Sequence, residues 1–233
     1  MLIVNTCLSF LNLSFFNRMQ ELLYPFKHLN FRAKNQTSIF QDDYNSVAIW
    51  VNHGTDTLIN ALMIIAMFIG FFQIKHLDFI MIKDSMDSTM LLTSFGMLAY
   101  SIFTIISGIL HSDNFGPLIV TNGIFELIEV QIQLLFIADL KHKRLRPAAS
   151  EATEAAEKPG RQVLTFLLVC NLGLWITYNF EMQKLDSTPG ALEFYGKMAW
   201  IVIQRITLPL CVFFRFHSTV VLSELWKDVY KTK

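Results

Sequence analysis

The sequence predicts an all-α fold, a polytopic bundle of about five helices that cross a membrane. Hydrophobic residues make up 53% of the 233 residues and charged residues only 16%, whereas a soluble domain typically has about 25% charged residues. Twenty-one Phe against ten Gly and six Pro also fit helices that face lipid. Five stretches reach the length of about 20 largely apolar residues that a membrane-spanning helix needs. They are residues 46–74, 89–110, 117–140, 163–180 and 198–222.

Several of these stretches carry further helix signals. The first is most apolar between Leu58 and Phe72, and the third opens with Pro117, a residue favoured in the first turn of a helix. The fifth contains Pro209, which has no backbone N–H to donate and is expected to kink that helix. The start of the chain holds a shorter apolar run without the basic start and cleavage site of a signal peptide. We therefore expect residues 1–43 to be extracellular or poorly ordered, and residues 44–232 to form the transmembrane region.

The distribution of Lys and Arg predicts the orientation of the bundle. Eleven of them follow the first, third and fifth stretches, and two lie in the connections after the second and fourth. Because basic residues concentrate in cytoplasmic loops, the C-terminus is expected to be cytoplasmic. Four basic residues within the first 45 positions weaken this bias without reversing it. The connection at residues 141–161 begins with basic residues and continues as an Ala- and Glu-rich stretch between prolines, which predicts a mobile cytoplasmic linker.

The third stretch contains polar residues that share one face. Asn122, Glu126, Glu129 and Gln133 are spaced so that they fall within about 60° of arc on a helix, whereas Gln131 lies on another face. Ionisable residues inside a spanning helix are costly unless they are paired or hydrated, so they commonly mark ion or proton pathways. The alternative is a seam of hydrogen bonds that holds helices together. Two glutamates favour proton exchange over a purely structural seam.

The fourth and fifth stretches also contain polar residues. Asn171 and Tyr178 are seven residues apart, so they lie on one face of the fourth helix, either in a proton pathway or in packing. In the fifth, His217 is a candidate proton relay because imidazole titrates near neutral pH and has two nitrogens. The alternative is an interfacial or merely hydrogen-bonded histidine. Arg205 and Arg215 are interpreted as structural or interfacial residues, with Arg215 extending to lipid headgroups.

Several function classes are not supported. A net charge of zero argues against nucleic acid as a partner. The chain has no Gly-rich phosphate-binding loop, no HExxH zinc motif and no GxSxG motif. Cys7, Cys170 and Cys211 have no metal-binding spacing and form no obvious disulfide framework. We therefore expect no enzymatic activity, no cofactor and no metal site.

Three segments resemble the last three helices of otopetrins: Glu129–Ile137 (EVQIQLLFI), Cys170–Ile176 (CNLGLWI) and Phe213–Ser218 (FFRFHS). Including the two preceding helices, the resemblance covers about residues 44–232. It implies a proton-selective channel of the plasma membrane that is opened by acid, blocked by zinc and assembled as a homodimer of twelve-helix chains.

The resemblance also assigns residues. It matches Glu129 to the intramembrane glutamate of the family's tenth helix and His217 to the histidine of its last helix. Gln133 and Asn171 match polar positions of the same interior. The other proton-pathway candidates, Asn122, Glu126 and Tyr178, rest on the helical-face argument alone.

These five helices correspond to the final five of the family's twelve, so we expect the chain to be a fragment or a truncated form. Its partners would be protons, the lipid bilayer and either a second copy or a full-length channel. Two alternatives to a proton channel remain open at this point. The chain could be a non-conducting membrane partner of a full-length channel, or a proton-coupled transporter with similar intramembrane carboxylates.

Overall fold

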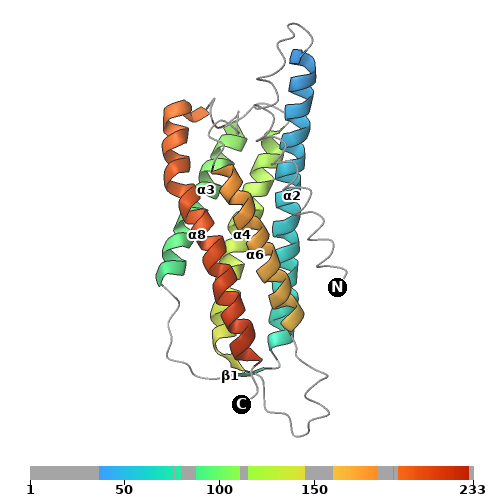
Figure 1. Cartoon of the computed structure of the whole chain (residues 1–233), viewed down its shortest axis with the longest axis vertical. Coiled ribbons are helices and arrows are strands. Elements are labelled where there is room, and N and C mark those ends of the chain that lie inside the picture. Colours follow the sequence, from blue (N-terminus) through green and yellow to red (C-terminus); the bar gives the residue numbers. More distant parts are fainter. Residues whose placement is uncertain are drawn as a thin grey trace.

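A computed structural model describes residues 37–75, 77–79, 88–110, 115–144, 160–182, 191 and 194–230. The predicted extracellular segment therefore lies mostly outside the described residues, as does the linker between positions 145 and 159. The described part is a helical bundle, with its helices running side by side along the long axis of the molecule (Figure 1). Its elements are α2 (Thr37–Ile74), β1 (Asp78–Phe79), α3 (Ser88–Leu110), α4 (Gly116–Lys141), β2 (Lys143–Arg144), α6 (Arg161–Glu181) and α8 (Lys197–Val229).

The five helices coincide with the five predicted stretches, which confirms the all-α fold class. Two differ in length. Helix α2 begins at Thr37 instead of residue 46, and α8 continues to Val229 instead of ending at residue 222. The added residues are more polar than the apolar stretches, and hydropathy detects only the part of a helix that suits the hydrocarbon core. Pro209 lies inside α8 and the helix continues through it.

Four of the described helices, α2, α3, α6 and α8, are long and apolar enough to cross a membrane. Helix α4 has 26 residues but also carries the two glutamates and two buried amides that lower its hydropathy. It packs against α2 on one side and α3 on the other, while α8 packs against α3 and α6. The helix with the two buried glutamates thus packs between two helices that are long and apolar enough to cross a membrane.

Side-chain burial divides each helix into two faces. The interior contains fully buried apolar residues such as Met67 and Phe136, while Phe72, Leu92 and Ile206 are among the large apolar side chains that remain exposed. An apolar outer surface is the arrangement required of helices in contact with lipid. Helices α3 and α8 approach closely at Gly96, where an added Cβ would meet Leu210 Cβ at 2.2 Å, as expected of small residues between membrane helices.

At one end of the bundle, a two-stranded sheet and a backbone-to-side-chain hydrogen bond join the connecting segments. Strands β1 and β2 pair antiparallel, with Asp78 opposite Arg144 and Phe79 opposite Lys143. The backbone N–H of Gly160, at φ +82°, donates to Gln73 Oε1 at 3.0 Å, which joins the start of α6 to the end of α2. The C-terminus lies at this same end (Figure 1).

Candidate functional site

The polar face of α4 points into the bundle. Glu129 and Gln133 are fully buried, Glu126 is 2% exposed and Asn122 is 9% exposed. Gln131 is exposed on another face. The prediction of a single buried polar face on this helix is confirmed. We call these four residues and their hydrogen-bond and ion-pair partners the polar column.

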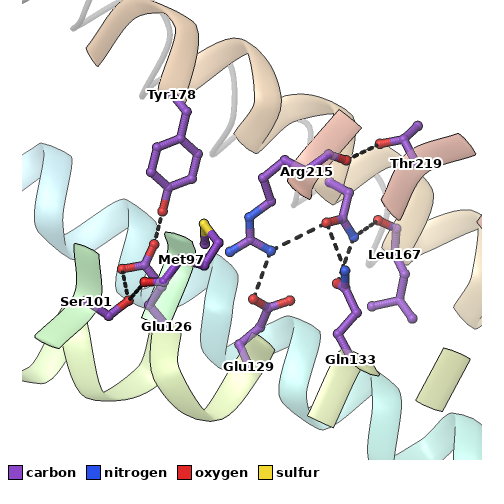
Figure 2. Close-up of polar contacts among 10 residues, drawn as sticks. Met97, Ser101, Glu126, Glu129, Gln133, Leu167, Tyr178, Arg215 and Thr219 are labelled. Carbon is purple, nitrogen blue, oxygen red and sulfur yellow. Dashed lines mark hydrogen bonds and ion pairs between the residues drawn. The ribbon is translucent and has the colours of Figure 1, made fainter. Parts of the chain in front are cut away.

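The central contact of the polar column is an ion pair between α4 and α8. Arg215 Nη1 lies 2.8 Å from Glu129 Oε2, and both side chains have no exposed area (Figure 2). The expectation that Arg215 extends to lipid headgroups is therefore wrong. A buried carboxylate opposite the guanidinium holds it inside the bundle, since an unpaired buried charge is strongly unfavourable.

A pair of amides continues the column on the side of Gln133. Asn171 Nδ2 donates to Gln133 Oε1 at 2.9 Å, and Gln133 Nε2 donates back to Asn171 Oδ1 at 3.3 Å. Asn171 Nδ2 also donates to the carbonyl of Leu167 at 2.9 Å, and Arg215 Nη1 donates to Asn171 Oδ1 at 3.4 Å. Glu129, Arg215, Asn171 and Gln133 therefore form one connected group from three helices (Figure 2).

Glu126 forms a second group, nearer the start of α4. Tyr178 O–H donates to Glu126 Oε1, and Ser101 O–H donates to Glu126 Oε2 at 2.8 Å (Figure 2). The Arg215 guanidinium carbon lies 6.0 Å from the centre of the Tyr178 ring, so the two groups lie close to each other. Ser101 was not identified from the sequence, because a serine in an apolar stretch most often donates to its own helix, as Ser101 also does to the carbonyl of Met97.

Two further polar contacts lie beyond Glu126. Thr57 O–H donates to Asn122 Oδ1 at 3.2 Å, which joins α2 to the column. Tyr100 O–H donates to Glu181 Oε1 at 2.9 Å, between α3 and the last residue of α6. Thr57, Tyr100 and Glu181 were not among the predicted site residues. No repeat of similar residues at helical spacing marks any of them in the sequence.

The remaining predicted residues of α8 are His217, Arg205 and Pro209. His217 is partly buried, and its ring stacks on Phe213 with centroids 5.9 Å apart and 20° between the planes. Arg205 and Pro209 are exposed on the outer surface of the helix. The structure thus brings Asn122, Glu126, Glu129, Gln133, Asn171 and Tyr178 together and adds Arg215 to them.

The polar column is rich in acceptors and retains unused hydrogen-bonding capacity. Glu126 and Glu129 share the interior with Arg215, the one fully buried cation among the described residues. Within the same part of the chain, Arg215 Nε and Nη2, Glu129 Oε1 and Gln204 Oε1 are buried without a hydrogen-bond partner. Buried polar atoms of this kind are normally satisfied by water. A chain of carboxylates, amides and hydroxyls with such sites can hold and transfer protons.

Comparison with known proteins decides the family. The otopetrin family model matches residues 37–216, which include α2, α3, α4 and α6, the first part of α8 and the whole polar column. The chain belongs to the otopetrin family. The resemblance inferred from the segments in α4, α6 and α8 is confirmed.

Individual otopetrins match shorter or longer parts of the chain. The chain is 36% identical over 182 residues to the proton channel OtopLc of Drosophila melanogaster, which covers 76% of this chain and 11% of that protein. It is 28% identical over 109 residues to the proton channel OTOP1 of Danio rerio, covering 38% of this chain and 19% of the relative. It is 36% identical over 66 residues to the proton channel OTOP2 of Homo sapiens, covering 28% of this chain and 12% of the relative.

The matches place the chain among multi-pass membrane proteins. They also show that it spans only between 11% and 19% of the length of these otopetrin relatives. Family membership therefore applies to the helices present here, and their activity is a separate inference from the polar column.

Proposed function

We propose that this chain forms the proton-conducting interior of an otopetrin proton channel, and that this channel is opened by acid. The observation that carries the proposal is the polar column, in which two buried glutamates on α4 contact residues of α3, α6 and α8. Its relatives are named proton channels, which supports the same reading. The proton pathway would comprise Glu126, Glu129, Gln133, Asn171 and Tyr178, with Asn122 and His217 at its ends.

Each group has a distinct part in this pathway. The glutamates would bind and release protons, because a carboxylate accepts a proton on either oxygen. The amides of Gln133 and Asn171 both donate and accept hydrogen bonds, so they can orient water between proton sites. His217 would exchange protons further along α8.

Arg215 supports selectivity for protons over metal cations. Its buried positive charge beside Glu129 opposes the entry of Na⁺ or K⁺, as charged and narrow pore linings do in other channels. A proton can pass because it is transferred between hydrogen-bonded groups and needs no room for a hydration shell. The ion pair also fixes Glu129 in the interior.

The proposed topology has the C-terminus on the cytoplasmic side of the plasma membrane. The end of the bundle that holds the C-terminus also holds Lys75, Lys141, Lys143 and Arg161 at helix ends and in β2, as cytoplasmic loops do. Epitope tags at the C-terminus should be accessible to antibody only after cells are permeabilised. Staining of intact cells would contradict this orientation.

The main test is proton flux through the purified chain in liposomes that contain a pH-sensitive dye. An external acid step should acidify the interior, and Glu129→Gln and Glu126→Gln should each reduce the rate. Glu224→Gln is the matched control, because Glu224 is exposed on α8. Equal flux in all four proteins, or no flux above that of empty liposomes, would contradict conduction by this chain.

A second candidate function is supported by the small part of each relative that this chain covers. A chain that spans 11% of the length of OtopLc could act by association with a full-length otopetrin or with a second copy of itself. Co-expression should then change the acid-evoked current of the full-length channel, while the chain alone carries none. A proton-coupled transporter would instead show saturable flux that depends on an added substrate.

A further inference from the structure

A second carboxylate–tyrosine pair lies outward of Glu126. Tyr100 on α3 is 6% exposed and donates its hydroxyl hydrogen to Glu181 Oε1 at 2.9 Å. Glu181 is partly buried and is the last residue of α6. Tyr178, which donates to Glu126, precedes Glu181 by one helical turn and so lies on the same side of α6. The two pairs therefore follow each other along one face of this helix.

Glu181 is the last residue of α6. Helix α6 starts near β1 and the end of α2 and runs toward the opposite end of the bundle, where it stops short of the ends of α2 and α8 (Figure 1). In the proposed topology this end faces the outside of the cell. The Tyr100–Glu181 pair then lies on the outer side of the Tyr178–Glu126 pair.

Aromatic rings surround this pair. The Tyr100 ring is 6.4 Å from that of Tyr178 in a T-shaped contact and 6.5 Å from that of Trp200 in a stacked contact. Trp200 stacks on Tyr195 at 5.7 Å with 9° between the planes. We call Tyr100 of α3, Tyr178 of α6, Trp200 of α8 and Tyr195, which lies just before α8, the aromatic wall. Close-packed rings exclude a hydrated metal cation, whereas the hydroxyls of Tyr100 and Tyr178 still connect to carboxylates on either side.

The two carboxylates are linked through the aromatic wall by direct contacts. Tyr178 donates to Glu126, its ring lies against that of Tyr100, and Tyr100 donates to Glu181.

We propose that Glu181 is the outer proton acceptor of the route, and that Tyr100 is a positioning residue that holds this carboxylate against the aromatic wall. This inference rests on the proposed proton conduction. A hydronium ion outside gives its proton to the Glu181 carboxylate, leaving water and a neutral carboxylic acid. The acid then releases the proton inward to the Glu126 carboxylate through intervening hydroxyls or water, which restores the Glu181 carboxylate.

The first test uses proton flux into liposomes that contain the full 233-residue chain. Glu181→Gln should reduce the inward flux after an external acid step, and Tyr100→Phe should reduce it by about fivefold, the factor expected from one net hydrogen bond. Tyr100→Leu, which removes the ring, should add a sodium leak that Tyr100→Phe does not. Glu224→Gln, exposed near the opposite end of the bundle, is the control and should leave the flux unchanged.

The second test does not depend on conduction. Infrared difference spectra of the same liposomes across an acid titration should contain a carboxylic-acid C=O band that Glu181→Gln removes. Tyr100→Phe should shift this band, because the hydroxyl no longer donates to the carboxyl group. Circular dichroism and gel filtration establish that each variant is folded.

The two tests separate the inferences. Absence of flux in the unmodified chain contradicts the proposed function, and the infrared band then decides the role of Glu181 alone. Unmodified flux in Glu181→Gln, or a C=O band that is insensitive to both substitutions, would overturn the assignment of Glu181 and Tyr100 even if the chain conducts protons.

Discussion

Arg215 on α8 and Glu129 on α4 form an ion pair with 2.8 Å between Nη1 and Oε2, and neither side chain has any exposed area. Removing one member of such a pair leaves an uncompensated charge inside the bundle. Arg215→Leu should therefore lower the free energy of unfolding by about 3–5 kcal/mol. Thermal or denaturant unfolding in detergent, followed by circular dichroism, measures the loss.

Arg205 provides the matched control for this prediction. It lies on the same helix and is exposed, so Arg205→Leu should have little effect on stability. The double variant Glu129→Leu and Arg215→Leu should recover much of the stability lost in Arg215→Leu, because no charge is then left unpaired. A similar loss in Arg205→Leu and Arg215→Leu would contradict the structural role of the pair.

The hydroxyls that bind Glu126 should affect both stability and proton flux. Tyr178→Phe and Ser101→Ala each remove one donor to this carboxylate, at an expected cost of about 1–2 kcal/mol per hydrogen bond between membrane helices. The liposome flux assay should also show slower proton entry in both variants. Ser223→Ala removes a hydroxyl that donates only to the carbonyl of Val220 in the same helix, and it should change neither quantity.

The two glutamines of α4 offer a comparison within a single helix turn. Gln133 is fully buried and exchanges two hydrogen bonds with Asn171, whereas Gln131 is exposed. Gln133→Leu should lower the unfolding free energy by about 1–2 kcal/mol because Asn171 loses its amide partner. Gln131→Leu should be neutral or stabilising in a bilayer. Unfolding midpoints of the two variants test this, and equal midpoints would count against the amide pair.

Glycine substitutions test the contact between α3 and α8. A Cβ added at Gly96 would meet the Leu210 side chain at 2.2 Å, while one at Gly54 on α2 meets no atom within 4 Å. Gly96→Ala should destabilise the bundle by about 1–3 kcal/mol through overpacking. Gly54→Ala should stabilise α2 by about 0.5–1 kcal/mol, since alanine favours a helix. Opposite signs in thermal unfolding are the expected result, and a stabilising Gly96→Ala would contradict the close approach.

Much of the fold followed from the sequence because membrane spans need long apolar stretches. The third span illustrates the strength of the method: the spacing of Asn122, Glu126, Glu129 and Gln133 predicted one polar face, and all four residues are buried. The interpretation of Asn171 and Tyr178 as residues of one face on the fourth span also agrees with their burial. Periodicity within a helix was sufficient for these predictions.

Contacts between helices could not be predicted in the same way. Arg215 lies in the C-terminal half of a long helix, where the side chain can extend either to headgroups or into the bundle. Only the position of Glu129 on another helix decides between them. Ser101, Tyr100 and Glu181 carry no periodic signal of their own, so their hydrogen bonds to other helices became visible only in three dimensions. The role of His217 in proton transfer stays a prediction.

The ion pair between α4 and α8 has a consequence for biosynthesis. Chains are made from the N-terminus, so Glu129 leaves the ribosome long before Arg215 has been synthesised. Throughout that interval the helix with the two buried glutamates lacks its buried cation, whereas the hydroxyl of Ser101 on α3 is already available to Glu126. A helix inserted later therefore completes the charge balance of a helix inserted earlier, and a nascent chain halted before α8 should be recognised as unfinished by the quality control of the membrane.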